Sequence, residues 1–368
     1  MAHSDLALTV LPELRADYDS SSFDKLEIKD PNAGALATAL KQNSDPESLV
    51  NADIAAKAQN AFGRALKVPV VDYSDITLGN SRTCAMQSFG LNSKLLTVTK
   101  QTISFGISMA PVQYYQNEIS YRADLMKKLN IASNKVRRTL DTAVIARLEA
   151  GKNAFWKSGA IASKYFAVSG DSLIIPQAQK DELYNALPSI SKEFELGGSY
   201  SDIITSPKHE QIVRRLAAQG SGNSINQAFQ FDGYSWAVSN QIADRTGVDL
   251  DGAGGATATG NVESTIYALQ PGSIGILFTV DPTARLGYET TKGTIWSQVA
   301  DPFSGIPMGL RYQSECTDAS AYQAAGVDYG TAEPVESWHF SFDYYLFDSY
   351  VSNRATMPSG ILKAEVMK

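Results

Sequence analysis

Residues 118–151, EISYRADLMKKLNIASNKVRRTLDTAVIARLEAG, decide the fold of this chain together with the strand-like segment just before them. Apolar residues recur in this stretch at intervals of three and four, the spacing of one face of an α-helix. The pattern continues until Gly151, a residue type that often ends helices. At 1.5 Å per residue the predicted helix is about 50 Å long. Its buried stripe is expected to contain Leu125, Leu129, Val136, Leu140, Val144 and Leu148.

The segment 102–109, TISFGISM, alternates polar and apolar residues, which is typical of a strand buried on one face. Together with residues 97–99 it predicts a long two-stranded excursion. An isolated hairpin is marginally stable in water, so we expect this one to lie on another surface, with a second copy of the chain as a candidate. The residues expected to make that assembly contact are Ile103, Phe105, Ile107 and Met109.

The polar side of the predicted helix carries more basic than acidic residues. Glu118 and Arg122, and likewise Asp124 and Lys128, are spaced four apart and favour ion pairs along the helix. We interpret this side as a solvated face. A weak contact with a packaged polyanion is the alternative.

The rest of the sequence predicts short elements of an α+β protein rather than repeated βαβ units. The first fifty residues lack sustained periodicity and are expected to form an extended arm with short helices, followed by a short helix over 51–66. A strand over 200–205 leads into a helix that is expected to run to residue 219. Asp232–Gly233 predicts a hairpin turn, and residues 249–261 predict a flexible loop. Strands are expected over 265–269, 275–280, 309–313 and 338–346.

Composition excludes several classes of protein. With 32 Lys and Arg against 39 Asp and Glu, the net charge of −7 argues against a general attraction to nucleic acid or anionic membranes. Cys84 and Cys316 are too few for a disulfide framework. No uncharged run approaches the roughly 18 residues that span a bilayer, and no leader is evident at the start. We therefore expect a soluble protein that is not secreted and has no membrane partner.

No motif for catalysis or ligand binding has the required spacing. Gly151–Lys152 lacks the first glycine of a phosphate-binding loop, and the glycines at 252–255 do not follow a buried strand. Asp249 and Asp251 lack the further ligands of a calcium loop. His209 and His339 are interpreted as structural histidines. We therefore predict no catalytic residue, no cofactor-binding residue and no metal ligand, and we expect that the chain is not an enzyme.

The order of these elements resembles that of tailed-bacteriophage major capsid proteins with the Hong Kong 97-type fold. The segments 103–107 (ISFGI) and 140–149 (LDTAVIARLE) look like that family's E-loop strand and spine helix. A second set of segments looks like its axial domain: 202–207 (DIITSP), 233–240 (GYSWAVSN) and 267–275 (YALQPGSIG).

The resemblance implies a division of the chain into five parts. These are an N-terminal arm (1–66), an E-loop β excursion (67–117), a peripheral domain with the spine helix (118–198), an axial or A-domain (199–330), and strands that return to the peripheral domain (331–368). The residue boundaries are expectations, since each motif is short.

The resemblance also implies a function. The chain is expected to be a virion capsid protein that assembles in the host cytoplasm. Its partners would be copies of itself in pentamers and hexamers, portal and scaffolding proteins, and packaged DNA through weak non-specific contact. An encapsulin-like compartment, or another phage structural protein of the tail or decoration type, is the alternative. A soluble enzyme with an unrecognised site is a third possibility.

Overall fold

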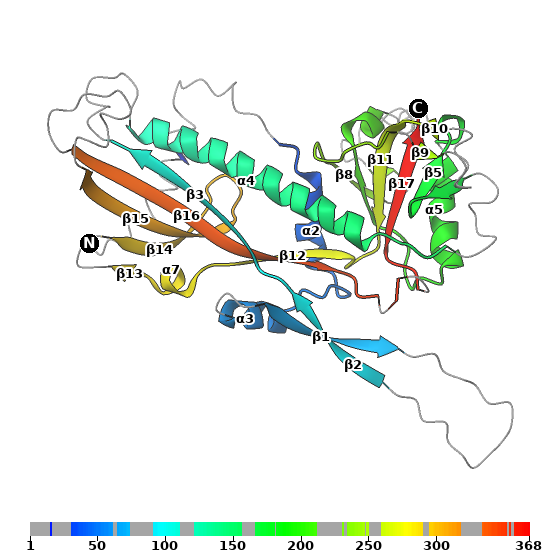
Figure 1. Cartoon of the computed structure of the whole chain (residues 1–368), viewed down its shortest axis with the longest axis horizontal. Helices are drawn as coiled ribbons and strands as arrows, with labels where there is room; N and C mark the ends of the chain where they lie inside the picture. The colour runs from blue at the N-terminus through cyan, green and yellow to red at the C-terminus, as the bar shows by residue number, and fades with distance from the viewer. Residues whose placement is uncertain are drawn as a thin grey trace, which may run out of the picture.

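The fold is seen in a computed structural model of the chain. The structure describes residues 15–16, 31–61, 65–73, 91–110, 121–156, 166–180, 182–211, 230–231, 234–246, 248–249, 259–289, 294–317, 333–351, 353–354 and 357–368. Helices and strands both build the core, which confirms the α+β class. The molecule is elongated, with a sheet towards each end and helix α4 (Tyr121–Gly151) running from one sheet to the other (Figure 1).

Strand β16 (Glu333–Asp348) is the centre of the first sheet, which we call the β16 sheet. One edge of β16 pairs antiparallel with β3 (Gln101–Met109). The other edge pairs first with β15 (Pro307–Thr317) and then with β12 (Ile274–Thr279). The sheet continues from β15 to β14 (Ile295–Ala300) and β13 (Tyr288–Glu289), with the short helix α7 (Pro282–Leu286) between β12 and β13. The length of β16 allows one strand to pair with three others.

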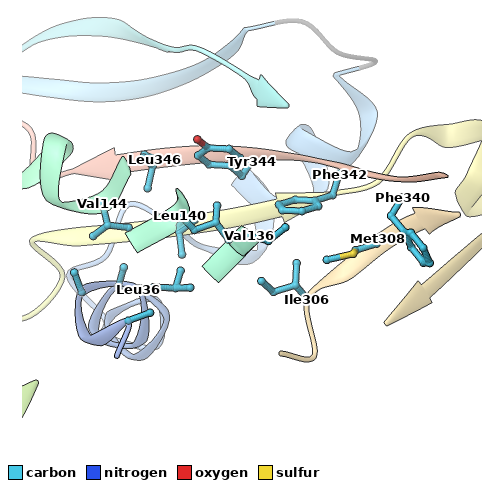
Figure 2. Close-up of a cluster of buried hydrophobic side chains, with 14 of the residues drawn as sticks. Leu36, Val136, Leu140, Val144, Ile306, Met308, Phe340, Phe342, Tyr344 and Leu346 are labelled. Carbon is cyan, nitrogen blue, oxygen red and sulfur yellow. The ribbon is translucent and has the colours of Figure 1, made fainter. Parts of the chain in front are cut away.

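Helix α4 lies on one face of the β16 sheet because its apolar stripe and the sheet's alternate residues bury one another. All six residues predicted for this stripe are at most 4% exposed. Figure 2 shows Val136, Leu140 and Val144 pointing towards Phe342 and Tyr344 of β16. The helix has 31 residues and is therefore about 46 Å long. Residues 118–120 of the predicted helix lie outside the described residues.

The second sheet, which we call the β17 sheet, has strand β17 (Ile361–Met367) near its middle. All seven residues of β17 are buried. Helix α5 (Glu182–Glu193) packs its apolar residues against one face of this sheet, with Leu183, Tyr184 and Leu187 among them. The strands run in the order β4 (Ala167–Ser169), β5 (Ser172–Ile175), β17, β11 (Val262–Leu269), β6 (Asp202–Thr205), β8 (Tyr234–Val238) and β7 (Gln230–Phe231).

Several local predictions in this region agree with the structure. Strand β6 ends at Thr205 and a helical turn follows at 207–211, while residues 212–219 lie outside the described residues. Strands β7 and β8 pair antiparallel on either side of the expected turn. The ends of the predicted flexible loop, β9 (Val248–Asp249) and β10 (Thr259–Gly260), pair with each other.

A hairpin projects from the opposite face of the β16 sheet. It consists of β1 (Leu66–Tyr73) and β2 (Leu91–Val98), paired from Leu66↔Val98 to Tyr73↔Leu91. Its base packs on helix α3 (Ala52–Asn60) and on Tyr345 and Phe347 of β16. Figure 1 shows the hairpin extending away from the rest of the molecule.

Two predictions about this region are wrong. The helix predicted over 51–66 ends at Asn60, and Leu66 begins β1 instead. Residues 97–98 pair with β1 and not with the 102–109 segment. Pro69, which lacks an N–H group, hides the alternation of β1 in the sequence. It is tolerated because β1 has a free edge within the described fold.

The two sheets divide the chain differently from the predicted domains. Strands β12, β14 and β15, from the range predicted as axial (199–330), belong to the β16 sheet. The β17 sheet contains β4 and β5, which come from the predicted peripheral range (118–198), and helix α5 from the same range packs on it. Strand β17, which was expected to return to the peripheral domain, lies in this sheet as well. Strand pairing between distant segments decides membership of a sheet, and local periodicity does not report it.

The burial of α4 generates a test of the shared core. Leu140 is fully buried, so Leu140→Ala is expected to lower the free energy of unfolding by about 2 to 5 kcal/mol, through lost burial and the cavity left behind. Urea denaturation of the unassembled subunit measures this change. Thr139→Ala, one residue away on the exposed side, is the matched control and should be nearly neutral. Equal stability of Leu140→Ala and the natural chain would contradict the packing described here.

Candidate assembly surface

The residues predicted for assembly lie in the chain's own sheet. Strand β3 pairs with β16 over nine residues, and the ring of Phe105 stacks on Phe340 with centroids 5.0 Å apart. Ile107 and Met109 are buried, and Ile103 is partly buried against the same core.

This placement corrects the predicted role of the strand. Within the subunit, Ile107 and Met109 complete the core under α4, and Ile103 and Phe105 pack partly buried against it. An aspartate in place of Phe105 or Ile107 would therefore test folding rather than assembly. The periodicity was interpreted properly as a strand, but a buried face does not reveal whether the same chain or another one covers it.

The hairpin β1–β2 is the element that has an uncovered side. Its inner face buries Leu66, Val68, Val70 and Val98. On its outer face Lys67, Pro69 and Thr97 are exposed, and the side chain of Leu95 is 64% exposed. Within the described part of the chain, neither strand pairs with a third strand. The hairpin thus presents an apolar residue and two open edges, which are groups that favour contact with another surface.

A second exposed apolar site lies at the end of α7. Leu286 is 81% exposed and Tyr288 is 58% exposed. Two exposed carboxylates, Asp281 and Glu289, flank them. Arg285 donates a hydrogen bond to the carbonyl of Gln59 at the end of α3, at 3.3 Å. We call Leu286 and Tyr288 the α7 patch; it lies close to the base of the hairpin and faces solvent.

An ionic cluster joins α4 to the β17 sheet, with Lys363 and Glu365 buried and Glu149 and Arg245 partly exposed. Glu149, near the end of α4, accepts hydrogen bonds from Lys152 at 2.6 Å and from Tyr267 of β11 at 2.7 Å. Lys363 of β17 is 2.9 Å from the Glu149 carboxylate and 3.2 Å from that of Glu365. Arg245 makes a two-pronged contact with Glu365, with Nε 2.7 Å from Oε1.

Helix α2 (Gly34–Gln42) makes a second connection between the two halves of the molecule. The carboxylate of Asp141 on α4 accepts from the backbone N–H of Leu36 at 2.9 Å and from the hydroxyl of Ser239. Lys41 pairs with Asp202 of β6 at 2.5 Å. A side chain on Gly34 would collide with the backbone of Val238, so a glycine is needed for this close approach to β8.

The surroundings of Glu149 and Asp141 shift the pKa values of both carboxyl groups. Burial raises the pKa of Glu149, but hydrogen bonds from Lys152, Lys363 and Tyr267 outweigh that effect and lower the pKa to about 2. Burial raises the pKa of Asp141, and the hydrogen bonds from Ser239 and the backbone of α2 oppose this rise. Glu149 is therefore held ionised at neutral pH by the residues that surround it.

The structure also tests whether the histidines form a reactive site. His209 is fully buried, and its Nε2 and Nδ1 atoms contact the hydroxyls of Tyr184 and Ser264, the second at 2.9 Å. Burial lowers its pKa to about 3, so it is neutral at pH 7. His339 lies exposed on β16, opposite Gly106. A neutral histidine closed off from solvent is suited to packing and not to exchanging protons with a substrate.

Other candidate sites were searched among the described residues. No group of three or more His, Cys, Asp or Glu side chains in that part of the chain is arranged to hold a metal ion. No helix there is long and apolar enough to cross a membrane. Asp251, which was rejected as part of a calcium loop, and the glycines at 252–255 lie outside the described residues.

Sequence reasoning predicted a β excursion over 67–117 but not the pairing of its strands, and it missed the α7 patch and the ionic cluster. Lys363 and Glu365 alternate with apolar residues in β17, and this pattern normally indicates a strand with one solvated face. Here that face is buried against the end of α4 and Arg245. Leu95 and Leu286 carry no local signal, because their exposure depends on what the folded chain leaves uncovered.

Comparison with known proteins gives structural matches only. No protein-family model and no curated protein sequence matches the chain. Among solved structures, one from Mycobacterium phage Che8 matches with 9% identity and a TM-score of 0.48, covering 86% of this chain and 89% of the other. One from Mycobacterium phage Bobi matches with 12% identity and a TM-score of 0.46, covering 94% and 95%. The capsid structure of the cyanophage P-SCSP1u matches with 12% identity and a TM-score of 0.41, covering 83% of each chain.

The ionic cluster predicts a difference in acid stability. Because the folded pKa of Glu149 is below its ordinary value of 4.5, its contribution is present above about pH 4.5 and is lost as the pH falls towards 2. Glu149→Gln lacks this contribution at every pH. We expect the variant to be less stable than the natural chain at pH 7 and the difference to shrink between pH 5 and 2. Urea midpoints across this range measure it, with the exposed Glu47→Gln as control. A difference that stays constant with pH would contradict the role given to Glu149.

His209 predicts a second pH effect. Its folded pKa of about 3 lies below the unfolded value of 6.5, so unfolding takes up a proton between these values and stability falls as the pH falls below 6.5. From pH 7 to pH 5 this amounts to about 2 kcal/mol. Unfolding of His209→Gln should lack that slope, whereas the exposed His339→Gln should keep it. Identical slopes in both variants would show that His209 titrates freely in the folded protein.

Proposed function

We propose that this chain is the major capsid protein of a tailed bacteriophage. In this proposal its copies assemble through pentamers and hexamers into an icosahedral or prolate shell around double-stranded DNA. The observation that carries the proposal is the hairpin β1–β2: among the described residues, only those at its base are covered, and Leu95 and both strand edges have no cover there. The resemblance of segments 103–107 and 140–149 to capsid proteins supports the same conclusion.

The physical argument starts from the instability of such a hairpin. A two-stranded ribbon without a third strand or a packed face is marginal in water. The inner face of β1–β2 is covered near Leu66 and Val98 by α3 and β16, but the outer face has no cover in the described chain. A second copy that packs on this face would bury Leu95 and stabilise the ribbon. The contact is therefore expected between copies rather than within one.

The α7 patch is the surface that we assign to the neighbouring copy. It is apolar at Leu286 and Tyr288 and has exposed carboxylates at Asp281 and Glu289, whereas the hairpin presents Leu95 beside the exposed Lys67. These two surfaces are complementary in charge and both contain uncovered apolar area. Because they are different surfaces of one molecule, their contact is head-to-tail, and a head-to-tail contact closes into rings when its rotation permits. Pentamers and hexamers are rings of this type.

The remaining partners follow from the proposed shell. A shell that is filled with DNA in the host cytoplasm needs a portal through which the DNA enters, and a scaffold sets the size of the shell, so we include portal and scaffolding proteins among the partners. The net charge of −7 is compatible with a container that holds its DNA weakly. The chain needs no catalytic residue for this role.

The head-to-tail contact can be tested with two variants. Leu95→Asp removes the hairpin side of the contact, and Leu286→Asp removes the α7 side. Each variant alone is expected to stay folded by circular dichroism and to remain monomeric in analytical ultracentrifugation. Mixed in equal amounts, they retain one intact contact per pair and should form dimers but nothing larger.

Ile131→Asp is the matched control, because Ile131 is 52% exposed but lies on α4. Negative-stain microscopy of this variant and of the natural chain should show closed shells. Shells formed by Leu95→Asp alone would show that the contact between the hairpin and the α7 patch is not needed for assembly and would contradict its assignment. Tubes or small rings formed by the natural chain would instead favour another phage structural role, and a stable monomer would overturn self-assembly.

A further inference from the structure

The outward face of helix α4 carries a positive charge that the proposed assembly contact does not use. The helix contains seven basic and three acidic residues, a net charge of +4. The whole chain carries −7, so taking away the +4 of the helix leaves −11 on the rest. One element thus opposes the sign of the whole molecule.

The acidic side chains of α4 are buried or paired with basic groups. The solvent-facing side of the helix therefore carries mainly basic residues. Asp141 is fully buried against α2, and Glu149 is engaged by Lys152, Lys363 and Tyr267. Asp124 is the remaining acid and pairs with Lys128 at 2.8 Å. Of the basic residues, Arg147 is taken up by Asp348 at 2.5 Å. The other basic side chains of the helix are Arg122, Lys127, Lys128, Lys135, Arg137 and Arg138.

Three of the four exposed basic residues of the helix follow one line along it. Lys128, Lys135 and Arg138 are all exposed and are separated by seven and three residues, so they share one face. This line is about 15 Å long. Lys135 and Arg138 have no carboxylate partner among the residues that the structure describes. The buried stripe of α4 packs on the β16 sheet and so holds in place the helix backbone that carries these cations on its exposed side.

From this arrangement we propose that the outward face of α4 binds the phosphate backbone of double-stranded DNA without reading its sequence. This inference rests on the proposed function, because it assigns the face that the shell turns towards its DNA. Phosphates present about one negative charge per 1.7 Å of duplex, so a 15 Å line of cations can meet several of them. Lysine and arginine side chains at exposed positions contact phosphates, and such contacts carry no base specificity.

The charge distribution also explains why such binding is weak. Each phosphate that a cation neutralises releases condensed counterions, which makes binding fall steeply as salt increases. A face with a few cations gives a correspondingly small number of contacts, and the −11 on the rest of the chain repels the duplex elsewhere. The duplex is therefore held at one face only, and it can slide along that face.

The test compares two pairs of substitutions that remove the same charge. Lys135→Ala with Arg138→Ala removes two cations from the α4 face. Lys192→Ala with Lys208→Ala removes two exposed lysines from the other half of the molecule, on α5 and at the turn after β6. Binding of a fluorescent duplex of random sequence to each full-length protein is measured between about 50 and 200 mM salt, because affinity that depends on phosphate contacts changes strongly with salt in this range.

The α4 pair is expected to reduce the slope of log K against log salt by about 2, which is about 1 per lost phosphate contact. The control pair should leave the slope unchanged. Equal slopes for the α4 pair and the natural chain would overturn the proposal, and so would an equal loss in the control pair. A protein that binds polyglutamate through these residues but no duplex would show that the face is built for an acidic protein, which also overturns it.

Failure of this inference and failure of the proposed function can be told apart. The α4 pair should still form closed shells in negative-stain images, because the face is assigned to DNA and not to a neighbouring copy. Normal shells with an unchanged salt slope would remove only the DNA-binding face. If the α4 pair reduces the slope but the natural chain forms no shells, only the capsid function would be ruled out. Loss of shells in the α4 pair would show that the face is a contact between copies and would overturn the assignment to DNA.

Discussion

The structure depends on the burial of both faces of one strand, β16. On one face, Phe340, Phe342 and Tyr344 pack against the apolar stripe of α4; on the other, Tyr345 and Phe347 cover the base of the hairpin. Alternate residues of a strand point to opposite faces, so one segment joins two cores. A core built this way transmits any displacement of β16 to both layers, because protein interiors are close-packed and deform little. Helix α4 and the base of the hairpin are thus held on opposite faces of the same strand.

The ionic cluster at the end of α4 defines the orientation of the second sheet. Buried ion pairs add little net stability, since the cost of removing charges from water offsets their attraction, but loss of one partner is expensive. Lys363 and Glu365 are buried in β17, and both must find a partner. Glu149 and Arg245 supply those partners from different elements. In the observed placement of α4 on the β17 sheet each of these four groups has a partner of opposite charge.

Local patterns predicted the elements that have a regular periodicity or clear turn residues. The stripe of α4, the strand that contains Ile103 to Met109 and the β7–β8 pair were all predicted from spacing or turn residues. The pairing of β1 with β2 was not predicted because Pro69 interrupts the pattern of β1. Local periodicity also does not report that strands from distant segments share a sheet. The candidate assembly surface was assigned to β3 for a related reason. Alternation reveals that a face is buried and does not reveal which chain covers it.

By itself the sequence determined which segments are amphipathic, the α+β class, and the charge asymmetry of α4, because helix and strand periods are written in the order of residues. The tertiary structure alone decided which of those faces remain open. It closed the face of β3 under α4 and left Leu95 and Leu286 uncovered. It also converted Lys363 and Glu365 from an apparent solvated face into a buried junction. Exposure is a property of the whole fold, since it depends on residues far apart in the chain that come to cover one another.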